Sequence, residues 1–304
     1  DKLDFVKHRK KFYTLSIVIL AVGLGILAIF KLNLGIDFDS GTRVEIQTEE
    51  ALTKEQVQEF LASVGVENDN VVISGEQENI AVTRFVDDFS QQQTLDLQAA
   101  VKKEYGEAAE ANVSTVSPKV GIELAKNAIK ALLIAALGII IYVAIRFEWR
   151  MGLGAIVSLL HDVFFIVAIF SLFRMEVDIT FIAAVLTIVG YSINDTIVTF
   201  DRIRENIERA GAITTKEELA LIVNKSLRQT MGRSLNTILT VIVVVVALIF
   251  LGAPSIQGFS IALLIGLLTG VYSSICIAAQ VWYSLKSRQM DKSGGAVVEK
   301  EKKE

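Results

Sequence analysis

The chain has 304 residues, of which 52% are hydrophobic, and its mean hydropathy is +0.49. Its formal net charge of −4 provides no positive field for binding nucleic acid. The single cysteine excludes an intrachain disulfide and argues against a thiolate metal site. The hydrophobic residues gather in long runs, and this clustering is typical of a membrane protein.

Six apolar runs are long enough to cross a bilayer, which requires about 20 residues each. A long polar stretch, residues 31–127, separates the first run from the second. We therefore predict an α-helical polytopic membrane protein with transmembrane helix 1 at residues 12–30 and helices 2–6 within residues 128–285. The runs are Phe12–Phe30, Ala128–Ile145, Met151–Phe173, Ile179–Phe200, Leu235–Leu251 and Phe259–Leu285.

Basic residues indicate the orientation of these helices, because cytoplasmic loops of membrane proteins carry an excess of lysine and arginine. If the runs are threaded in order, the basic segments all fall on one side, at residues 1–11, 146–150, 201–234 and 286–304. In the short loops of the other side, Arg174 alone is basic. Both termini are therefore predicted to be cytoplasmic, and the domain of residues 31–127 to be outside.

The domain of residues 31–127 alternates between strand and helix signals. Thr53 is a candidate cap for an amphipathic stretch, and a second helical stretch with apolar residues begins at Ser90. The order β-α-β-β-α-β predicts an extracytoplasmic α+β ferredoxin-like domain, with two helices on a four-stranded sheet. The predicted elements are the extended segment Leu34–Thr48, helices Thr53–Val64 and Ser90–Tyr105, and strands Val71–Ser74, Ile80–Phe85 and Ala111–Ser117. The predicted core comprises Val44, Ile46, Leu61, Val72, Ile80, Val82, Leu97 and Val113.

Two segments outside the apolar runs have signals of their own. In residues 216–230 the apolar side chains recur at helical spacing, which predicts an amphipathic helix on the membrane surface within the cytoplasmic loop 201–234. The tail, residues 286–304, is polar and charged and is predicted to be disordered. The chain starts with Asp1 rather than methionine, which fits either a segment of a longer polypeptide or a processed product.

Asp195 lies inside the fourth apolar run. An ionised carboxylate at the centre of a membrane helix costs about 2.5–3.5 kcal/mol, so such residues commonly mark ion pathways. Its neighbours Tyr191, Ser192 and Thr199 predict a polar stripe that faces the bundle. One interpretation is a protonatable site in an ion path, which would include the preceding Asn194. The other is a structural carboxylate bonded to a neighbouring helix.

Arg233 opens the fifth run and begins a polar stripe, which continues through Asn236, Thr237 and Thr240. One interpretation is a basic anchor at the lipid headgroups. The other pairs its permanently charged guanidinium with Asp195 at a similar depth, which would favour the ionised carboxylate until something separates the two.

His161 and Asp162 are adjacent in the middle of the third run. Successive helical residues point about 100° apart, so both cannot lie on one face, and one of them is expected to meet another helix. A His–Asp pair suits a proton relay. The alternative is polar packing with satisfied hydrogen bonds.

Other motifs indicate packing, or exclude classes of enzyme. Gly266, Gly270 and Ser274 form a small-xxx-small ladder that predicts close helix packing. The chain has no glycine-rich phosphate loop and no His-Glu-x-x-His sequence, so neither a nucleotide motor nor a zinc protease is indicated. The Gly-x-Gly-Asp context of intramembrane aspartyl proteases is also absent around Asp195.

Several motifs resemble those of the SecDF family of protein-export membrane proteins, a branch of the resistance-nodulation-division (RND) superfamily, and specifically its SecF members. Gly35-Ile-Asp37-Phe38-Asp-Ser40-Gly41-Thr42 is similar to the family's Gly-x-Asp-Phe-x-Gly-Gly-Thr signature, with Ser40 in place of a glycine. The segment from Tyr191 through Asp201 and Arg202 to Asn206 is a long match, and Gly232-Arg-Ser-Leu-Asn-Thr237 fits the opening of the fifth helix.

The resemblance implies a component of the Sec pathway that uses the proton motive force to assist protein translocation at the outer face of the bacterial plasma membrane. Asp195 and Arg233 would match the family's functional membrane carboxylate and arginine. The implied partners are SecD, as a separate subunit or a fused half, the Sec protein-conducting channel, the unfolded translocating polypeptide and membrane lipids. Protons would be the coupling ion, with no other cofactor, no metal and no enzymatic reaction.

Two other classes of function are weighed against this one. A passive scaffold would stabilise a partner complex in the membrane without moving protons. Small-molecule efflux is known in the RND superfamily, but its members usually carry far larger outside domains than residues 31–127 provide.

The predicted orientation can be tested with reporter fusions. A reporter that requires the cytoplasm should be active when fused after Arg209 or Met290 and inactive after Gly75. Activity at Gly75 would contradict the threading.

Overall fold

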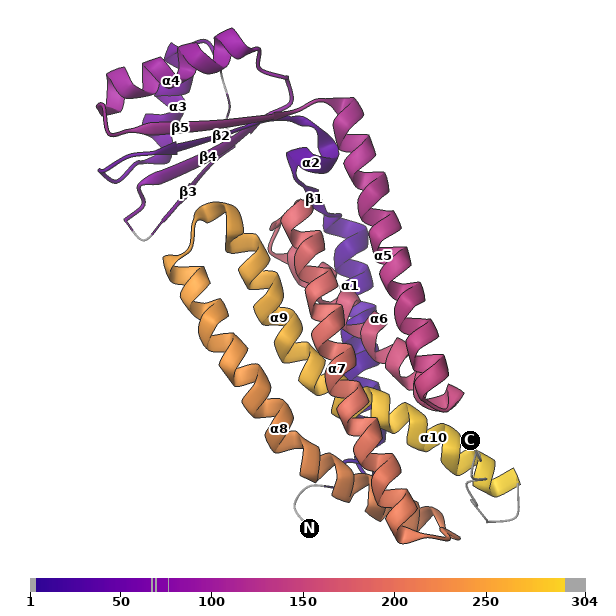
Figure 1. Ribbon diagram of the computed structural model, residues 1–304. Coiled ribbons are helices and arrows are strands. Elements are labelled where there is room, and N and C mark those ends of the chain that lie inside the picture. Colours follow the sequence, from indigo (N-terminus) through magenta and orange to yellow (C-terminus); the bar gives the residue numbers. More distant parts are fainter. Residues whose placement is uncertain (1–3, 67, 69, 76, 293–304) are drawn as a thin grey trace.

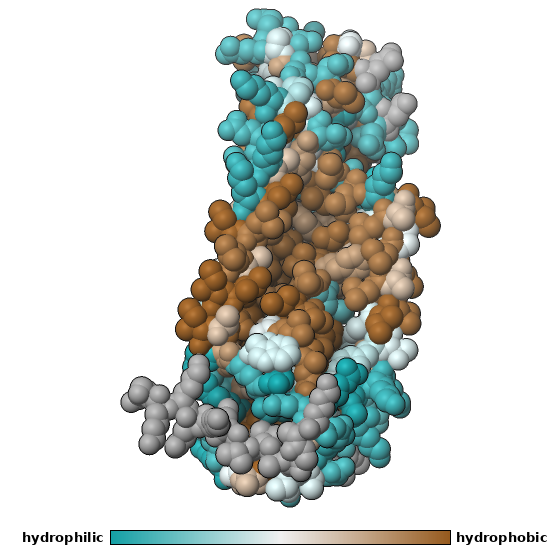
Figure 2. Space-filling view, turned by 90° about the vertical axis from the view of Figure 1, so that its right-hand side faces the viewer, coloured by the Kyte–Doolittle hydropathy of each residue, from teal (hydrophilic) through white to brown (hydrophobic). Residues whose placement is uncertain are grey.

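The computed structural model describes residues 4–66, 68, 70–75 and 77–292, which form two parts (Figure 1). One part is a bundle of long helices, the membrane bundle, and the other is the sheet domain, residues 41–117. Among the described residues, 6 helices are long and apolar enough to cross a membrane, in agreement with the predicted spans. On the face of the molecule shown in Figure 2, an apolar band over the bundle separates two polar ends.

Three spans keep close to their predicted bounds, whereas α5 and α8 begin earlier than predicted and α7 ends later. α5 begins at Pro118 rather than at Ala128, so its first turns carry the chain out of the sheet domain. The spans are α1 (Arg9–Phe30), α5 (Pro118–Arg146), α6 (Trp149–Leu172), α7 (Ile179–Ala210), α8 (Lys216–Leu251) and a composite of α9 (Gln257–Ser273), the π-helical turn η2 (Ser274–Ala278) and α10 (Ala279–Lys292), which follows the short turn η1 (Pro254–Ile256).

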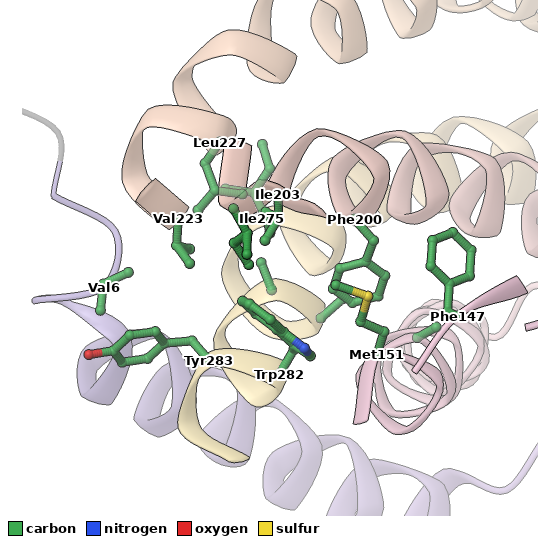
Figure 3. Packing of buried hydrophobic residues seen from close by; sticks show 14 of the residues in the cluster. Val6, Phe147, Met151, Phe200, Ile203, Val223, Leu227, Ile275, Trp282 and Tyr283 are labelled. Atoms are coloured by element: carbon green, nitrogen blue, oxygen red, sulfur yellow. The ribbon is translucent and has the colours of Figure 1, made fainter. Parts of the chain in front are cut away.

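The predicted membrane-surface helix at residues 216–230 is wrong, because this stretch forms the first turns of the continuous helix α8. Its apolar residues Leu219, Val223 and Leu227 are buried inside the protein rather than laid on lipid. They pack against α7 and α10 in a cluster that includes Trp282 and Tyr283 (Figure 3). We call this end of the bundle, opposite the sheet domain, the far end.

The predicted loop and tail are also shorter than expected. α7 continues to Ala210 and α8 begins at Lys216, so residues 211–215 alone connect them instead of the whole stretch 201–234. The tail was predicted to be disordered from residue 286, but α10 continues as a helix to Lys292. Residues 293–304 lie outside the described residues.

The sheet domain contains four antiparallel strands in the order β3-β4-β2-β5. Two helices cover the face of the sheet that points away from the bundle (Figure 1). Both helices begin with a capping box, at Thr53, whose role as a cap was predicted, and at Ser90. The elements are β2 (Gly41–Gln47), α3 (Lys54–Ser63), β3 (Val71–Ser74), β4 (Ile80–Phe85), α4 (Gln91–Tyr105) and β5 (Glu110–Val116).

The core of this domain lies between the sheet and its two helices. Val44, Ile46, Leu61 and Leu97 are buried there as predicted, and Val113 packs against them. Val72 was predicted to be in the core, but it is 57% exposed. Side chains alternate along a strand, so burial of Val71 places Val72, and its cross-strand partner Val82, on the opposite face. Ile80 is buried but does not join this cluster.

The predicted extended segment Leu34–Thr48 is interrupted. β1 (Asn33–Leu34) pairs in parallel with β6 (Glu176–Val177), which directly precedes α7. The short helix α2 (Ile36–Asp39) follows, and β2 begins after it. Ser40 and Gly41 both have positive φ values, 61° and 111°, which turn the chain from α2 into the sheet.

The sheet-domain core can be tested with a pair of variants in the whole chain. Leu61→Ala should destabilise the domain by about 2–5 kcal/mol, because it removes fully buried methyl groups. Val72→Ala should change stability by less than about 0.5 kcal/mol, because its side chain lies outside the core. Hydrogen exchange of the β2 and β4 amides measures both effects, and equal exchange in the two variants would contradict this core.

Candidate functional site

A cavity of about 130 Å³ lies between α7, α8 and α9 within the membrane bundle. Asp195 and Arg233, the two charged residues singled out in the fourth and fifth apolar runs, both line it. The other lining residues are Tyr191, Ser192, Asn194, Val198, Ser234, Thr237, Ile238, Gly266, Leu267 and Gly270. The fold therefore brings the two candidates together from helices that are neighbours both in sequence and in space.

The carboxyl group of Asp195 is only half satisfied by hydrogen bonds. The Ser234 hydroxyl, on α8, donates to its Oδ1 atom, and the Ser274 hydroxyl also lies beside the group. Its Oδ2 atom is buried and has no hydrogen-bond partner. Because an unpaired carboxylate oxygen is costly in a membrane, this atom is poised to gain a proton or a new donor.

Arg233 lies at the mouth of the cavity rather than in an ion pair. Its side chain is exposed on the surface of the chain, and no nitrogen of the guanidinium lies within 4.0 Å of the Asp195 carboxylate. It is close enough to attract Asp195 electrostatically. The next polar residues of its stripe, Asn236, Thr237 and Thr240, are exposed on the same helix.

Asp162 is the hub of a second polar cluster, where α6, α7 and α9 meet. Its Oδ2 atom accepts hydrogen bonds from the Ser192 hydroxyl at 2.7 Å and from the Ser273 hydroxyl at 2.6 Å. The residue is 1% exposed. Ser192 also lines the Asp195 cavity, so a single side chain connects the two sites.

His161 is buried beside Asp162, although the two side chains leave the helix in different directions. Its Nδ1 atom lies 3.3 Å from Asp162 Oδ1, and its Nε2 atom is buried without a partner. Its ring lies 6.0 Å from that of Tyr272, whose hydroxyl group hydrogen-bonds with Ser16 on α1. The expected contact with another helix is thus made by Asp162, and His161 extends the polar cluster towards α1.

The π-helical turn η2 was not anticipated from the sequence. It follows Gly270 and Ser273, and its first residue Ser274 hydrogen-bonds with Thr196 of α7 at 2.9 Å. π turns commonly occur at functional sites. The small-residue ladder Gly266, Gly270 and Ser274 was the sequence signal that lies nearest to this turn. The close helix packing predicted from the ladder is confirmed, because a Cβ atom at Gly266 would lie 2.4 Å from Ile188.

Other predicted residues lie at the edge of the cavity or away from it. Asn194 and Tyr191 line the cavity but are exposed, so the predicted stripe facing the bundle is wrong for Tyr191. Asp201 pairs with Arg146 at 3.3 Å, and Arg202 pairs with Glu205 at 2.7 Å, both towards the far end. The signature residues Gly35, Asp37, Phe38, Gly41 and Thr42 lie at the junction between the bundle and the sheet domain.

Comparison with known families identifies the chain. The family model of the protein export membrane protein SecD/SecF C-terminal region matches residues 96–288, and the SecD/SecF GG motif matches residues 25–51. The chain belongs to the SecD/SecF family. It is therefore a multi-pass membrane protein of the protein-export type, in agreement with its six apolar helices.

Individual relatives span different lengths. The chain is 55% identical to the protein translocase subunit SecDF of Bacillus subtilis over 292 residues, which cover 96% of the chain but 39% of that relative. It is 41% identical to the protein translocase subunit SecF of Alicyclobacillus acidocaldarius, over 96% of each. The chain thus matches a whole SecF, and a minor part of SecDF.

Two solved structures have the same fold. The crystal structure of SecDF from Thermus thermophilus superposes with a TM-score of 0.81 at 32% identity, covering 94% of this chain and 39% of that one. The super-membrane-facing form of SecDF superposes with a TM-score of 0.68 at 32% identity, covering 96% of this chain and 40% of that one.

The Asp162 cluster can be tested by its effect on stability. Asp162→Ala should lower the free energy of unfolding by about 1–3 kcal/mol, because it removes the acceptor shared by the buried Ser192 and Ser273 hydroxyls, and the Gly270 carbonyl oxygen remains as an acceptor for Ser273 alone. Asp162→Asn should lose less, since its amide oxygen still accepts. Thermal unfolding in detergent, with the exposed Glu123→Ala as control, measures the difference. Identical loss in the two Asp162 variants would contradict the hydroxyl contacts.

Proposed function

We propose that the chain acts as the SecF portion of a SecDF complex, which uses the proton motive force to assist protein translocation. The observation that carries the proposal is Asp195, whose half-satisfied carboxyl group faces a cavity inside the membrane bundle. A carboxyl in that position exchanges protons at modest cost, because a proton on Oδ2 removes a charge that the surroundings satisfy incompletely.

The proposed proton pathway contains Asp195, Arg233, Asn194, Asp162 and His161. Arg233 at the cavity mouth stabilises the ionised carboxylate, and the polar side chain of Asn194 lines the same opening. Ser192 joins this cavity to Asp162 through its 2.7 Å hydrogen bond. His161 lies next to Asp162, and its ring neighbours that of Tyr272, whose hydroxyl group hydrogen-bonds with Ser16 of α1. Protons are the coupling ion, and we propose no other cofactor and no enzymatic reaction.

An exposed polar face in the bundle supports a helical partner. Arg233, Asn236, Thr237 and Thr240 of α8 and Thr187, Tyr191 and Asn194 of α7 are exposed on the surface of this chain. Polar groups facing lipid are costly, whereas helices in membranes use such groups as contacts. We propose that SecD, as a fused half or a separate subunit, covers this face.

The sheet domain is the proposed site of action on the translocating polypeptide, at the outer face of the bacterial plasma membrane. The strand order β3-β4-β2-β5, with both helices on one face, supports a ferredoxin-like domain. The distribution of basic residues supports placing it outside, with both termini cytoplasmic and the Sec channel as neighbour. One charge moving through 100 mV supplies about 2.3 kcal/mol, enough to shift the population of two conformations.

A substitution at the carboxylate separates this coupler from a passive scaffold. Asp195→Asn should assemble at normal levels but should lose proton conductance and export support, because an amide does not titrate. A scaffold would tolerate the change, since neutral Asn costs less to insert than Asp. Proton flux and translocation in membrane vesicles measure both functions. The exposed Glu208→Gln, on the same helix, is the matched control.

The role of Arg233 has its own test in the same vesicles. Arg233→Lys should reduce export if the planar guanidinium serves Asp195, whereas a headgroup anchor should work equally well as Lys. The double variant Asp195→Asn/Arg233→Gln should be no worse than either single variant. Full, gradient-dependent export in Asp195→Asn would refute the proton mechanism and leave the family assignment intact.

A further inference from the structure

The family signature lies where the sheet domain joins the membrane bundle, and its two halves hold different parts of the molecule. β1 pairs with β6 in the register Asn33↔Glu176 and Leu34↔Val177, and the Gly35 amide donates to the Val177 carbonyl at 2.8 Å. These contacts attach the start of the signature to the residues that lead directly into α7. The helix that carries Asp195 is thus linked to the signature by backbone hydrogen bonds.

Asp37 extends this attachment to the first turn of α7. Its Oδ2 atom accepts a hydrogen bond from the backbone amide of Ile179, the first residue of α7, at 2.9 Å. The first amides of a helix have no partner within the helix, and a negative charge there interacts favourably with the helix dipole. Asp178 already caps the amide of Phe181 at 2.8 Å, so Asp37 adds a cap from a separate element.

Close packing against α7 on one side and α5 on the other fixes the position of α2. A Cβ atom at Gly35 would lie 3.2 Å from Asp178 Cβ, so a larger residue would push α2 away from α7. Phe38, on α2, packs into the hydrophobic cluster at this end of the bundle. On the other side, a Cβ atom at Gly121 of α5 would lie 3.3 Å from the Asp37 carbonyl oxygen.

The second half of the signature is fixed to the sheet. A Cβ atom at Gly41 would lie 2.3 Å from the Phe85 carbonyl oxygen on β4, so the close approach of β2 requires glycine. Thr42 is fully buried, and its hydroxyl donates to the Asp87 carbonyl at 2.9 Å and accepts from the Phe89 amide at 3.0 Å. Only the short helix α2 separates the α7 contacts from the sheet contacts.

We propose that Asp37 is a positioning residue that couples α7 to the sheet domain. α7 is continuous from Ile179 to Asp195, a distance of roughly 24 Å at helical rise, so a displacement at the protonation site moves the capped end as well. Asp37 transfers that displacement through α2 to β2. The inference rests on the proposed proton-driven function. In it, the signature transmits the movement of α7 to the sheet domain.

The test uses the whole SecDF complex in membrane vesicles and three variants of α2. Asp37→Ala should keep proton conductance within about twofold of wild type, because the Asp195 cavity is intact, but should lose the export support that depends on the gradient. Asp37→Asn should retain export, since its amide oxygen accepts the same Ile179 amide. The control is Asp39→Ala, which removes the exposed carboxylate of the same helix and should behave as wild type.

Amide exchange gives a readout independent of transport. The Ile179 amide should exchange about fivefold faster in Asp37→Ala, the effect expected for loss of a helix cap, and should be nearly unchanged in Asp37→Asn. Full export in Asp37→Ala, joint loss of conductance and export, or failure of Asn to substitute would overturn the coupling role. If wild type and Asp195→Asn conduct protons and export alike, the proposed function fails instead, and the inference falls with it.

Discussion

The structure depends on satisfying one carboxylate, Asp162, where water is absent. Hydrocarbon offers no donors, so a charged side chain inside a membrane protein must find its partners on other helices. Ser192 of α7 and Ser273 of α9 supply them to α6, and this contact draws three helices together at one point. Gly266 of α9 brings its backbone against Ile188, and Gly270 lies against Ser192, so hydrogen bonding and close packing fix the same arrangement.

Asp195 differs from Asp162 in how completely its carboxyl oxygens are hydrogen-bonded. Both Asp162 oxygens lie within reach of polar side chains, whereas Asp195 has one buried oxygen without a partner. Asp195 therefore offers an unsatisfied acceptor beside a cavity, whereas Asp162 is hydrogen-bonded to side chains of two other helices. The two acids have different surroundings although they lie in similar apolar runs.

The sequence predicted those features whose signals are local. Apolar length located the spans, and the Thr53 cap marked the start of α3. Errors arose where a neighbouring element decides the outcome. The stretch 216–230 looks like a surface helix until α7 and α10 cover it, and Val72 looks like core until the strand register is known. The partners of Asp162 and the cap from Asp37 come from distant residues, so no spacing in the sequence reveals them.

The three helices that line the Asp195 cavity differ in how much of their surface is buried inside the protein. In their apolar windows α7 is 39% buried and the last span 61%, whereas α8 is 11% buried. α8 is nevertheless anchored at the far end, where Leu219, Val223 and Leu227 are buried, and towards the sheet domain it diverges from α7 but stays beside α9 (Figure 1). Ser234, which donates to Asp195, and Arg233 both belong to this loosely packed helix. Under the proposed mechanism, a change in the charge of Asp195 would act on the helix of the cavity that has the least packing to oppose it, and α7 would carry the displacement towards the sheet domain.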